Sequence, residues 1–182
     1  MNRWAFYSGI GFTLVVVVFK CYVLYTGMYF SNWGFKFANL TAVLIYTIWI
    51  PVTLVVINRE HYRWHMPGRE VFKAGLGIVA ISLIGISVYH VFEVQSDEFK
   101  QQANRYYNSS EYLQLLKQQH ALHPQLFKLQ DIPKIIASQT KGISVFRAVT
   151  GRMIPFLLYG GLVSLFTAIG LRVFKSKAFK SS

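Results

Sequence analysis

Residues 74–92 read AGLGIVAISLIGISVYHVF, an apolar run without a single Asp, Glu, Lys or Arg side chain. As an α-helix rising 1.5 Å per residue, the run would be about 28 Å long, which matches the ~30 Å hydrocarbon core of a bilayer. Its glycines and serines are residues that membrane helices tolerate well. The stretch therefore predicts a membrane-spanning helix.

Three further runs have a similar length and composition: residues 4–25, interrupted by Lys20, residues 37–57 and residues 153–171. The whole chain is 53% hydrophobic and only 14% charged, whereas about a quarter of the residues in a soluble domain are charged. We expect a single integral membrane domain over residues 1–182, folded as an all-α bundle of four transmembrane helices.

The formal net charge is +12. In a soluble protein this excess would suggest nucleic acid, but here the basic residues flank apolar runs, a pattern typical of binding to anionic lipid headgroups. We therefore predict membrane lipids, and not nucleic acid, as partners. The candidate headgroup-binding residues are Arg59, Arg63, Arg69, Lys73, Lys175 and Lys177.

The distribution of these charges predicts an orientation. Basic residues crowd the connection between the second and third runs and follow the fourth, whereas the connection between the first two carries only Lys36. Because cytoplasmic flanks collect Lys and Arg, both termini should be cytoplasmic in a bacterial inner membrane. Residues 94–151 would then form an extracytoplasmic insert between the third and fourth spans.

The insert is polar but carries helical periodicity. Asn108 is a candidate helix cap, Pro124 should end that helix, and Asp131 should begin another that leads into the last span. Such amphipathic helices can lie along the membrane surface or cover the end of the bundle. The sequence leaves both arrangements open.

Small residues recur at helical spacing in the third and fourth spans, which would let the two backbones approach closely. We expect these two spans to pack on each other. The residues concerned are Gly77, Gly85, Gly160, Gly161, Ser164 and Ala168.

Two ionisable residues fall near the outer ends of their spans. Lys20 stands sixteen residues after Trp4, about 24 Å along a helix, and Glu93 stands twenty after Lys73, about 30 Å. They could form an intramembrane pair, with His90 one turn earlier, and line a small polar cavity. Alternatively, Lys20 extends to the interface and Glu93 only marks a helix end.

Catalytic and metal-binding patterns are missing from the sequence. His61 and His65 have the i, i+4 spacing of a helical metal pair, but no third ligand accompanies them and nearby arginines would repel a cation. There is no nucleotide loop, nucleophile motif or paired-carboxylate site. We expect a protein that is not an enzyme and that has no cofactor and no metal.

Three segments also carry a resemblance: the arginine-rich residues 58–63, PGREVFKAGL at residues 67–76, and MIPFLLYGGLVSL at residues 153–165. In this order they resemble the Bacteroidota-type four-span inner-membrane family catalogued as domain of unknown function forty-one ninety-nine. The resemblance implies four spans, an insert between spans three and four, and a basic C-terminus. It implies no site residues.

Together these features favour a non-enzymatic accessory or assembly subunit of a bacterial envelope complex, with a membrane-protein partner or a second copy of the chain. The alternative is a small transporter or lipid-handling protein with an outer-leaflet polar cavity near Lys20, His90 and Glu93.

Overall fold

The structure is a computed structural model, which describes residues 3–124, 128–140 and 145–178. For residues 32–42, 129, 140, 145–149, 152 and 175–178 it describes only the backbone. The described residues form α-helices and one short 3-10 turn at Leu129–Asp131, with no strand. The helices are α1 (Arg3–Tyr25), α2 (Asn32–Tyr62), α3 (Gly68–Gln95), α4 (Asp97–Tyr107), α5 (Ser110–Leu122), α6 (Ile132–Thr140) and α7 (Val145–Ala178).

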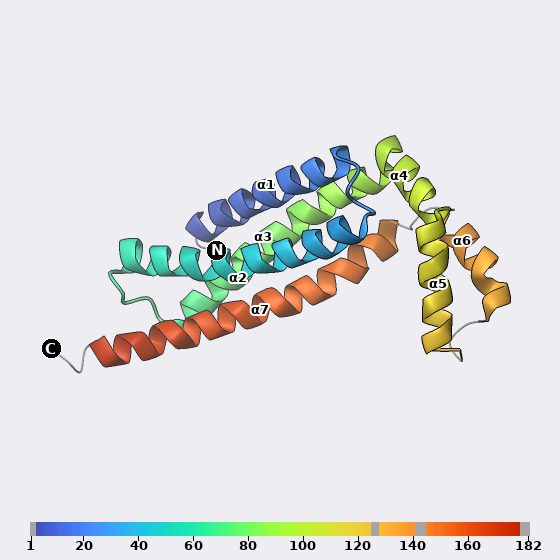
Figure 1. Ribbon diagram of the computed structural model, residues 1–182. Helices are drawn as coiled ribbons and strands as arrows, with labels where there is room; N and C mark the ends of the chain where they lie inside the picture. The colour runs from blue at the N-terminus through green and yellow to red at the C-terminus, as the bar shows by residue number, and fades with distance from the viewer. Residues whose placement is uncertain (1–2, 125–127, 141–144, 179–182) are drawn as a thin grey trace.

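Four long helices, α1, α2, α3 and α7, lie side by side and form an elongated bundle (Figure 1). α3 makes the most extensive contacts, with α7 and with α1. The connection between α2 and α3 lies at the same end as the C-terminal part of α7, and α4, α5 and α6 lie at the opposite end (Figure 1). The all-α fold and the four long apolar helices agree with the sequence prediction.

All four helices contain a segment long and apolar enough to cross a membrane: Arg3–Tyr25, Val43–Tyr62, Gly68–Gln95 and Met153–Phe174. These helices extend beyond the apolar runs from which they were predicted, since α3 already begins at Gly68 and α7 at Val145. Hydrophobicity defines only the part of a helix in contact with hydrocarbon, whereas the hydrogen-bonded backbone continues into polar flanks.

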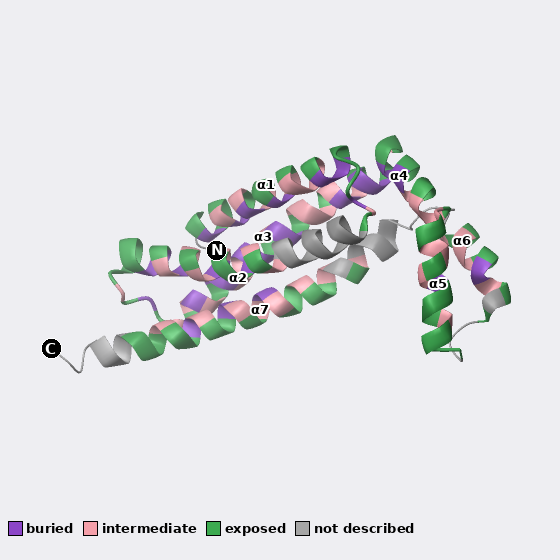
Figure 2. Ribbon diagram, in the orientation of Figure 1, coloured by how far each residue is buried: buried purple, intermediate pink, exposed green. Residues whose placement is uncertain are grey.

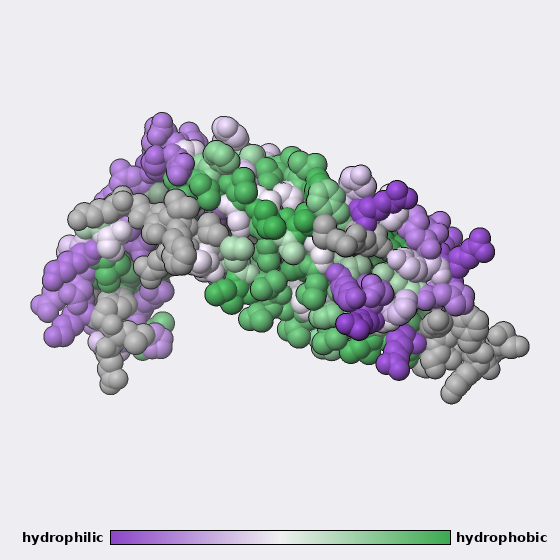
Figure 3. All heavy atoms as spheres, turned by 180° about the vertical axis from the view of Figure 1, so that it is seen from behind, coloured by the Kyte–Doolittle hydropathy of each residue, from purple (hydrophilic) through white to green (hydrophobic). Residues whose placement is uncertain are grey.

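The outer surface of the bundle is apolar. Large hydrophobic side chains such as Val18, Phe92 and Phe166 are each about two-thirds exposed, at 67%, 68% and 68%. Exposed residues line the outward faces of the helices, and the buried ones turn inward (Figure 2). From behind, hydrophobic side chains form a belt around the middle of the molecule, with hydrophilic residues at both ends (Figure 3). These features describe a multi-pass membrane protein, whose apolar belt contacts lipid.

The bundle core is built around Tyr46 of α2, which is 0% exposed. Its ring meets those of Phe12 and Phe156 at centroid distances of 4.6 and 5.8 Å. The Tyr46 hydroxyl lies 3.0 Å from Ser82 Oγ of α3, which itself donates to the Ile78 carbonyl. A polar tyrosine tip is thus hydrogen-bonded inside an apolar core, where an unpaired hydroxyl would be costly.

The insert is partly attached to the bundle. Phe99 of α4 is buried with Val23, Leu24, Tyr29 and Val94, and Gln102 Nε2 donates to the Leu24 carbonyl at 2.7 Å. α4 therefore covers the end of the bundle, while α5 and α6 project to one side (Figure 1).

One detail of the insert differs from the sequence prediction. Ser109, not Asn108, caps α5 by accepting a hydrogen bond from the Tyr112 amide, because Asn108 closes the end of α4 by bonding to Asn104. α6 covers Ile132–Thr140 and α7 begins at Val145; the junction at which the last helix of the insert was expected to lead into the final span, residues 141–144, lies outside the described residues. The predicted end at Pro124 is confirmed, since α5 stops at Leu122.

Candidate functional site

The polar residues of the predicted pair come together where the C-terminal ends of α1 and α3 meet. Lys20 Nζ lies 3.0 Å from both Glu93 Oε1 and Glu93 Oε2, and therefore donates to both carboxylate oxygens. The Lys20 side chain is 15% exposed and the Glu93 side chain 0%. The contact joins residues 73 positions apart in the sequence, so it holds the two helices in one register.

Two more side chains approach Glu93. The Tyr29 hydroxyl donates to Glu93 Oε2 at 3.2 Å, and Lys20 Nζ lies 3.4 Å from the same hydroxyl. His90, one helical turn before Glu93 on α3, directs its Nδ1 at Oε2. We call Lys20, Tyr29, His90 and Glu93 the polar cluster. Its carboxylate has partners on both oxygens, as burial of a charge requires.

Backbone geometry explains why Tyr29 reaches the cluster. α1 ends at Tyr25 and the chain reverses at Gly27, whose φ is +71°. Gly27 N bonds to the Leu24 carbonyl and Met28 N to the Val23 carbonyl, the pattern of a glycine-terminated helix end. Residues with side chains rarely adopt this φ, so glycine fits the turn that brings Tyr29 back against α1.

Aromatic rings surround the ammonium group. Lys20 Nζ lies 5.3 Å from the centre of the Tyr29 ring and 5.5 Å from that of Tyr89. The Tyr89 hydroxyl in turn lies 3.6 Å from Cys21 Sγ. Ring faces stabilise a cation in a poorly solvated place. The lysine is therefore held by one carboxylate and two aromatic rings.

The polar cluster is closed. The Glu93 side chain has no surface that a water molecule could touch, so the cavity expected next to Lys20 and Glu93 does not adjoin the carboxylate. The alternative in which Lys20 only extends to the interface also does not hold, because its ammonium turns to Glu93. Chemically, the arrangement is a neutral ion pair that joins α1 to α3.

No metal centre accompanies the polar cluster. Among the residues that the structure describes, no three His, Cys, Asp or Glu side chains gather in a way that could hold a metal ion. The His61–His65 pair does not share a helical face, because α2 ends at Tyr62. His61 stacks on Trp4 at 4.6 Å, and His65 Nδ1 lies 2.6 Å from the Arg63 carbonyl.

The small residues were expected at one helix contact, that of α3 with α7, but they lie at two: α3 with α7 and α3 with α1. On α7, a Cβ added at Gly160 would lie 2.6 Å from Tyr46 and 2.7 Å from Val79. Ser164 and Ala168 are buried at 0% and 6% exposure. These residues belong to the expected contact of α3 with α7.

The other three small residues do not take part in this close contact between α3 and α7. Gly85 faces α1, where an added Cβ would lie 2.5 Å from Thr13. Gly161 faces α3 only loosely, since an added Cβ would lie 3.9 Å from Leu76 Cδ2, and Gly77 is half-buried. On α3, Gly75 faces α7 closely, because an added Cβ there would lie 2.5 Å from Ser164 Oγ.

The basic residues lie at the opposite end of the bundle from the polar cluster. Arg59, Arg63, Arg69 and Lys73 are exposed there. Arg59 lies 3.3 Å from Glu60, and Lys73 lies 2.8 Å from Glu70. Lys175 and Lys177 belong to the last part of α7, where the side chains lie outside the described residues.

Sequence reasoning missed Tyr29, Gly75 and the buried Asn58. Tyr29 is one of eleven tyrosines, and only its place after Gly27 could have marked it. Gly75 lies beside Gly77 in the same run, and periodicity does not distinguish which of the two faces α7.

No protein-family model, curated protein or solved structure matches this chain.

Proposed function

We propose that this protein is a non-enzymatic accessory or assembly subunit of a complex in a bacterial envelope. The observation that carries this proposal is the closure of the polar cluster. A carboxylate with 0% side-chain exposure, bonded to lysine on both oxygens, leaves no room for a substrate. Such a pair serves to fix the helices relative to each other, with the registry role that buried ion pairs fulfil best.

The shape of the molecule supports the same proposal. α4 is anchored to the bundle through Phe99 and Gln102, and it carries α5 and α6 away from the bundle axis (Figure 1). Most of α5 is exposed, including Leu122 at 74%. A four-helix membrane bundle from which the polar helices α5 and α6 project suits a protein that positions another protein.

The test is purification of the full-length chain in a mild detergent, followed by identification of bound proteins and measurement of their stoichiometry. We expect one membrane or envelope protein at a fixed ratio, retained through size exclusion. A matched variant, Lys117→Glu on the exposed face of α5, should weaken that association, whereas Arg59→Gln at the other end should not. A chain that purifies alone, in detergents that keep other envelope complexes intact, would contradict the proposal.

The second candidate function is a small transporter or lipid-handling protein that works through the polar cluster. The observation in its favour is the remaining 15% exposure of the Lys20 side chain, next to titratable His90 and Glu93. This function requires the pair to separate during a cycle. Proton or ion uptake by proteoliposomes, abolished by Glu93→Gln in a folded protein, would favour it over the accessory role.

The proposed orientation places α5 outside and the α2–α3 connection in the cytoplasm. In a Cys21→Ala background, a cysteine at the exposed Gln118 of α5 should react with an impermeant maleimide in intact spheroplasts. A cysteine at the exposed Glu60 should react only after the membrane is opened. The reason is the excess of Lys and Arg at the Glu60 end of the bundle. The reverse pattern would invert the topology, and equal labelling of both sites from outside would mean that α3 does not cross the membrane between them.

A further inference from the structure

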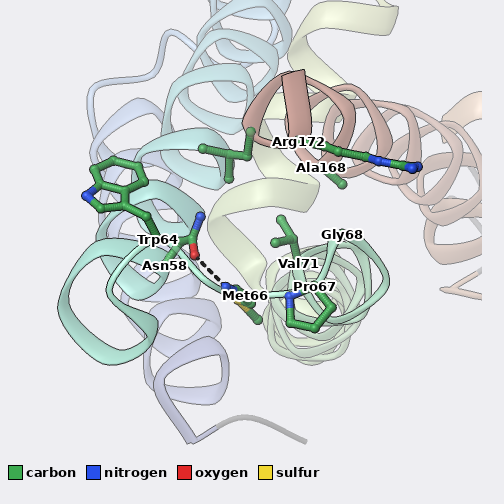
Figure 4. Close-up of a pocket in the computed structure, with 9 residues that line it drawn as sticks. Asn58, Trp64, Met66, Pro67, Gly68, Val71, Ala168 and Arg172 are labelled. Carbon is green, nitrogen blue, oxygen red and sulfur yellow. Dashed lines mark hydrogen bonds between the residues drawn. The ribbon is translucent and has the colours of Figure 1, made fainter. Parts of the chain in front are cut away.

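A cavity of about 240 Å³ opens at the basic end of the bundle, between the α2–α3 connection and the last turns of α7. Its walls come from three elements: Asn58 at the end of α2, Trp64 and Met66 in the connection, and Arg172 on α7 (Figure 4). The floor is apolar, formed by Val71 and Ala168. This cavity lies far from the polar cluster and is not explained by it.

Asn58 is the polar residue that shapes the cavity. The residue is 3% exposed, although its side chain is an amide with two hydrogen-bonding ends. Oδ1 accepts a hydrogen bond from the Met66 amide at 3.1 Å. Nδ2 points away from Met66, towards α7 (Figure 4), and donates to no partner among the described residues. Because the residue as a whole is buried and lines the cavity, this donor can bond an acceptor placed in the cavity.

The same cavity includes the start of α3. Pro67 and Gly68 line it, and no side chain caps this helix terminus. The first amides of a helix point outward, and its dipole favours a negative charge there. An added Cβ at Gly68 would meet nothing within 4 Å, so the chain is not packed against other atoms on that side of Gly68. The terminus and the Asn58 amide thus offer donors, and not acceptors, to the same cavity.

The surrounding charges favour an anion as well. Arg172 lines the rim and extends its guanidinium outward (Figure 4), while Arg63 and Arg69 are exposed nearby in the sequence. The two acidic residues of this region are each paired with a base: Glu60 with Arg59 at 3.3 Å and Glu70 with Lys73 at 2.8 Å. Arginine suits phosphate in particular, because its fork of donors matches the phosphate oxygens.

We infer that this cavity binds a phosphate group, carried by an anionic phospholipid whose headgroup enters between α2, α3 and α7. The phosphate oxygens accept from Asn58 Nδ2 and from the amides at the start of α3, and Arg172 neutralises the charge. Hydrophilic side chains gather at both ends of the molecule (Figure 3), and the cavity lies at the basic end, at the level proposed for the headgroups of one leaflet. Its apolar floor fits the first carbons of a lipid. The inference goes beyond the proposed function and does not depend on it.

Binding is tested with the full-length protein in a neutral detergent by native mass spectrometry, during titration with phosphatidylglycerol. Phosphatidylcholine serves as the neutral-headgroup comparison and inorganic phosphate as the soluble source of the same group. We expect one tightly held phosphatidylglycerol in the wild type. If inorganic phosphate displaces it at low millimolar concentration, the site is a phosphate site that soluble anions also reach; if it does not, the lipid is the ligand. Both results support an anion site.

The variants make the test specific. Asn58→Asp keeps the Oδ1 acceptor for Met66 but replaces the donor with a negative charge, and should weaken binding roughly tenfold or more. Arg172→Gln removes an exposed charge without disturbing the core, and should also weaken binding. Arg59→Gln is the control, since Arg59 does not line the cavity and should leave affinity unchanged. Equal affinity of the wild type, Asn58→Asp and Arg172→Gln would overturn the phosphate site. Equal binding of phosphatidylcholine, which carries the same phosphate with a compensating positive charge, would overturn the preference for an anionic lipid.

Discussion

Replacing Gly75 with leucine should destabilise the protein by on the order of 3 kcal/mol, the upper part of the range for overpacking a core. A Cβ at this position would lie 2.5 Å from Ser164 Oγ and 2.6 Å from Ser164 Cβ. Because Ser164 Cβ is attached to the α7 backbone, relief requires α3 and α7 to move apart. The expected result is a large fall in the detergent melting temperature.

The matched control is Gly170→Leu on α7, where an added Cβ meets nothing within 4 Å. It adds the same side chain to an exposed helical position and should leave the melting temperature nearly unchanged. A second comparison combines Gly75→Ala with Ser164→Gly, which removes the atoms that the new methyl group would meet. The combination should melt higher than Gly75→Ala alone. Equal melting of Gly75→Leu and Gly170→Leu would contradict the close approach of α3 to α7.

The contact of α3 with α7 shows which features of the fold can be predicted from the sequence and which cannot. Hydropathy identifies the four spans because hydrocarbon imposes a length and an apolar composition on any helix that crosses it. It does not give the rotation of each helix about its own axis, since lipid and the protein interior both accept apolar residues. Gly85 was therefore expected against the last span and lies against α1, while Gly75 was overlooked.

More of the polar cluster than of the helix contacts could be predicted from the sequence, because charged residues are scarce in these spans. Counting residues along the first and third spans, which run parallel, placed Lys20 and Glu93 at the same depth, where the structure brings them to 3.0 Å. Tyr29 could not be anticipated, because its position depends on the turn at Gly27 and not on a helical repeat. Asn58 was missed for a similar reason: its role follows from the path of residues 63–67.

Either half of the ion pair should be costly to remove. Lys20→Met leaves the buried Glu93 carboxylate without its cation, and Glu93→Gln leaves an ammonium beside two aromatic rings. Breaking a buried pair from one side typically costs ~3–5 kcal/mol. We expect each single variant to melt well below the wild type and to accumulate less in membranes. Lys73→Met is the control, because Lys73 pairs with Glu70 on the surface, where such pairs contribute at most about 1 kcal/mol.

The central claim is that Lys20 and Glu93 act as a closed structural pair, and the double-mutant cycle tests it most directly. Combining Lys20→Met with Glu93→Gln removes both charges at once, while the amide oxygen that replaces the carboxylate can still accept from Tyr29. The double variant should be more stable than the sum of the two single losses predicts, with a coupling of about 2 kcal/mol or more between the positions. Strictly additive losses would mean that the two charges do not depend on each other, and would contradict the account.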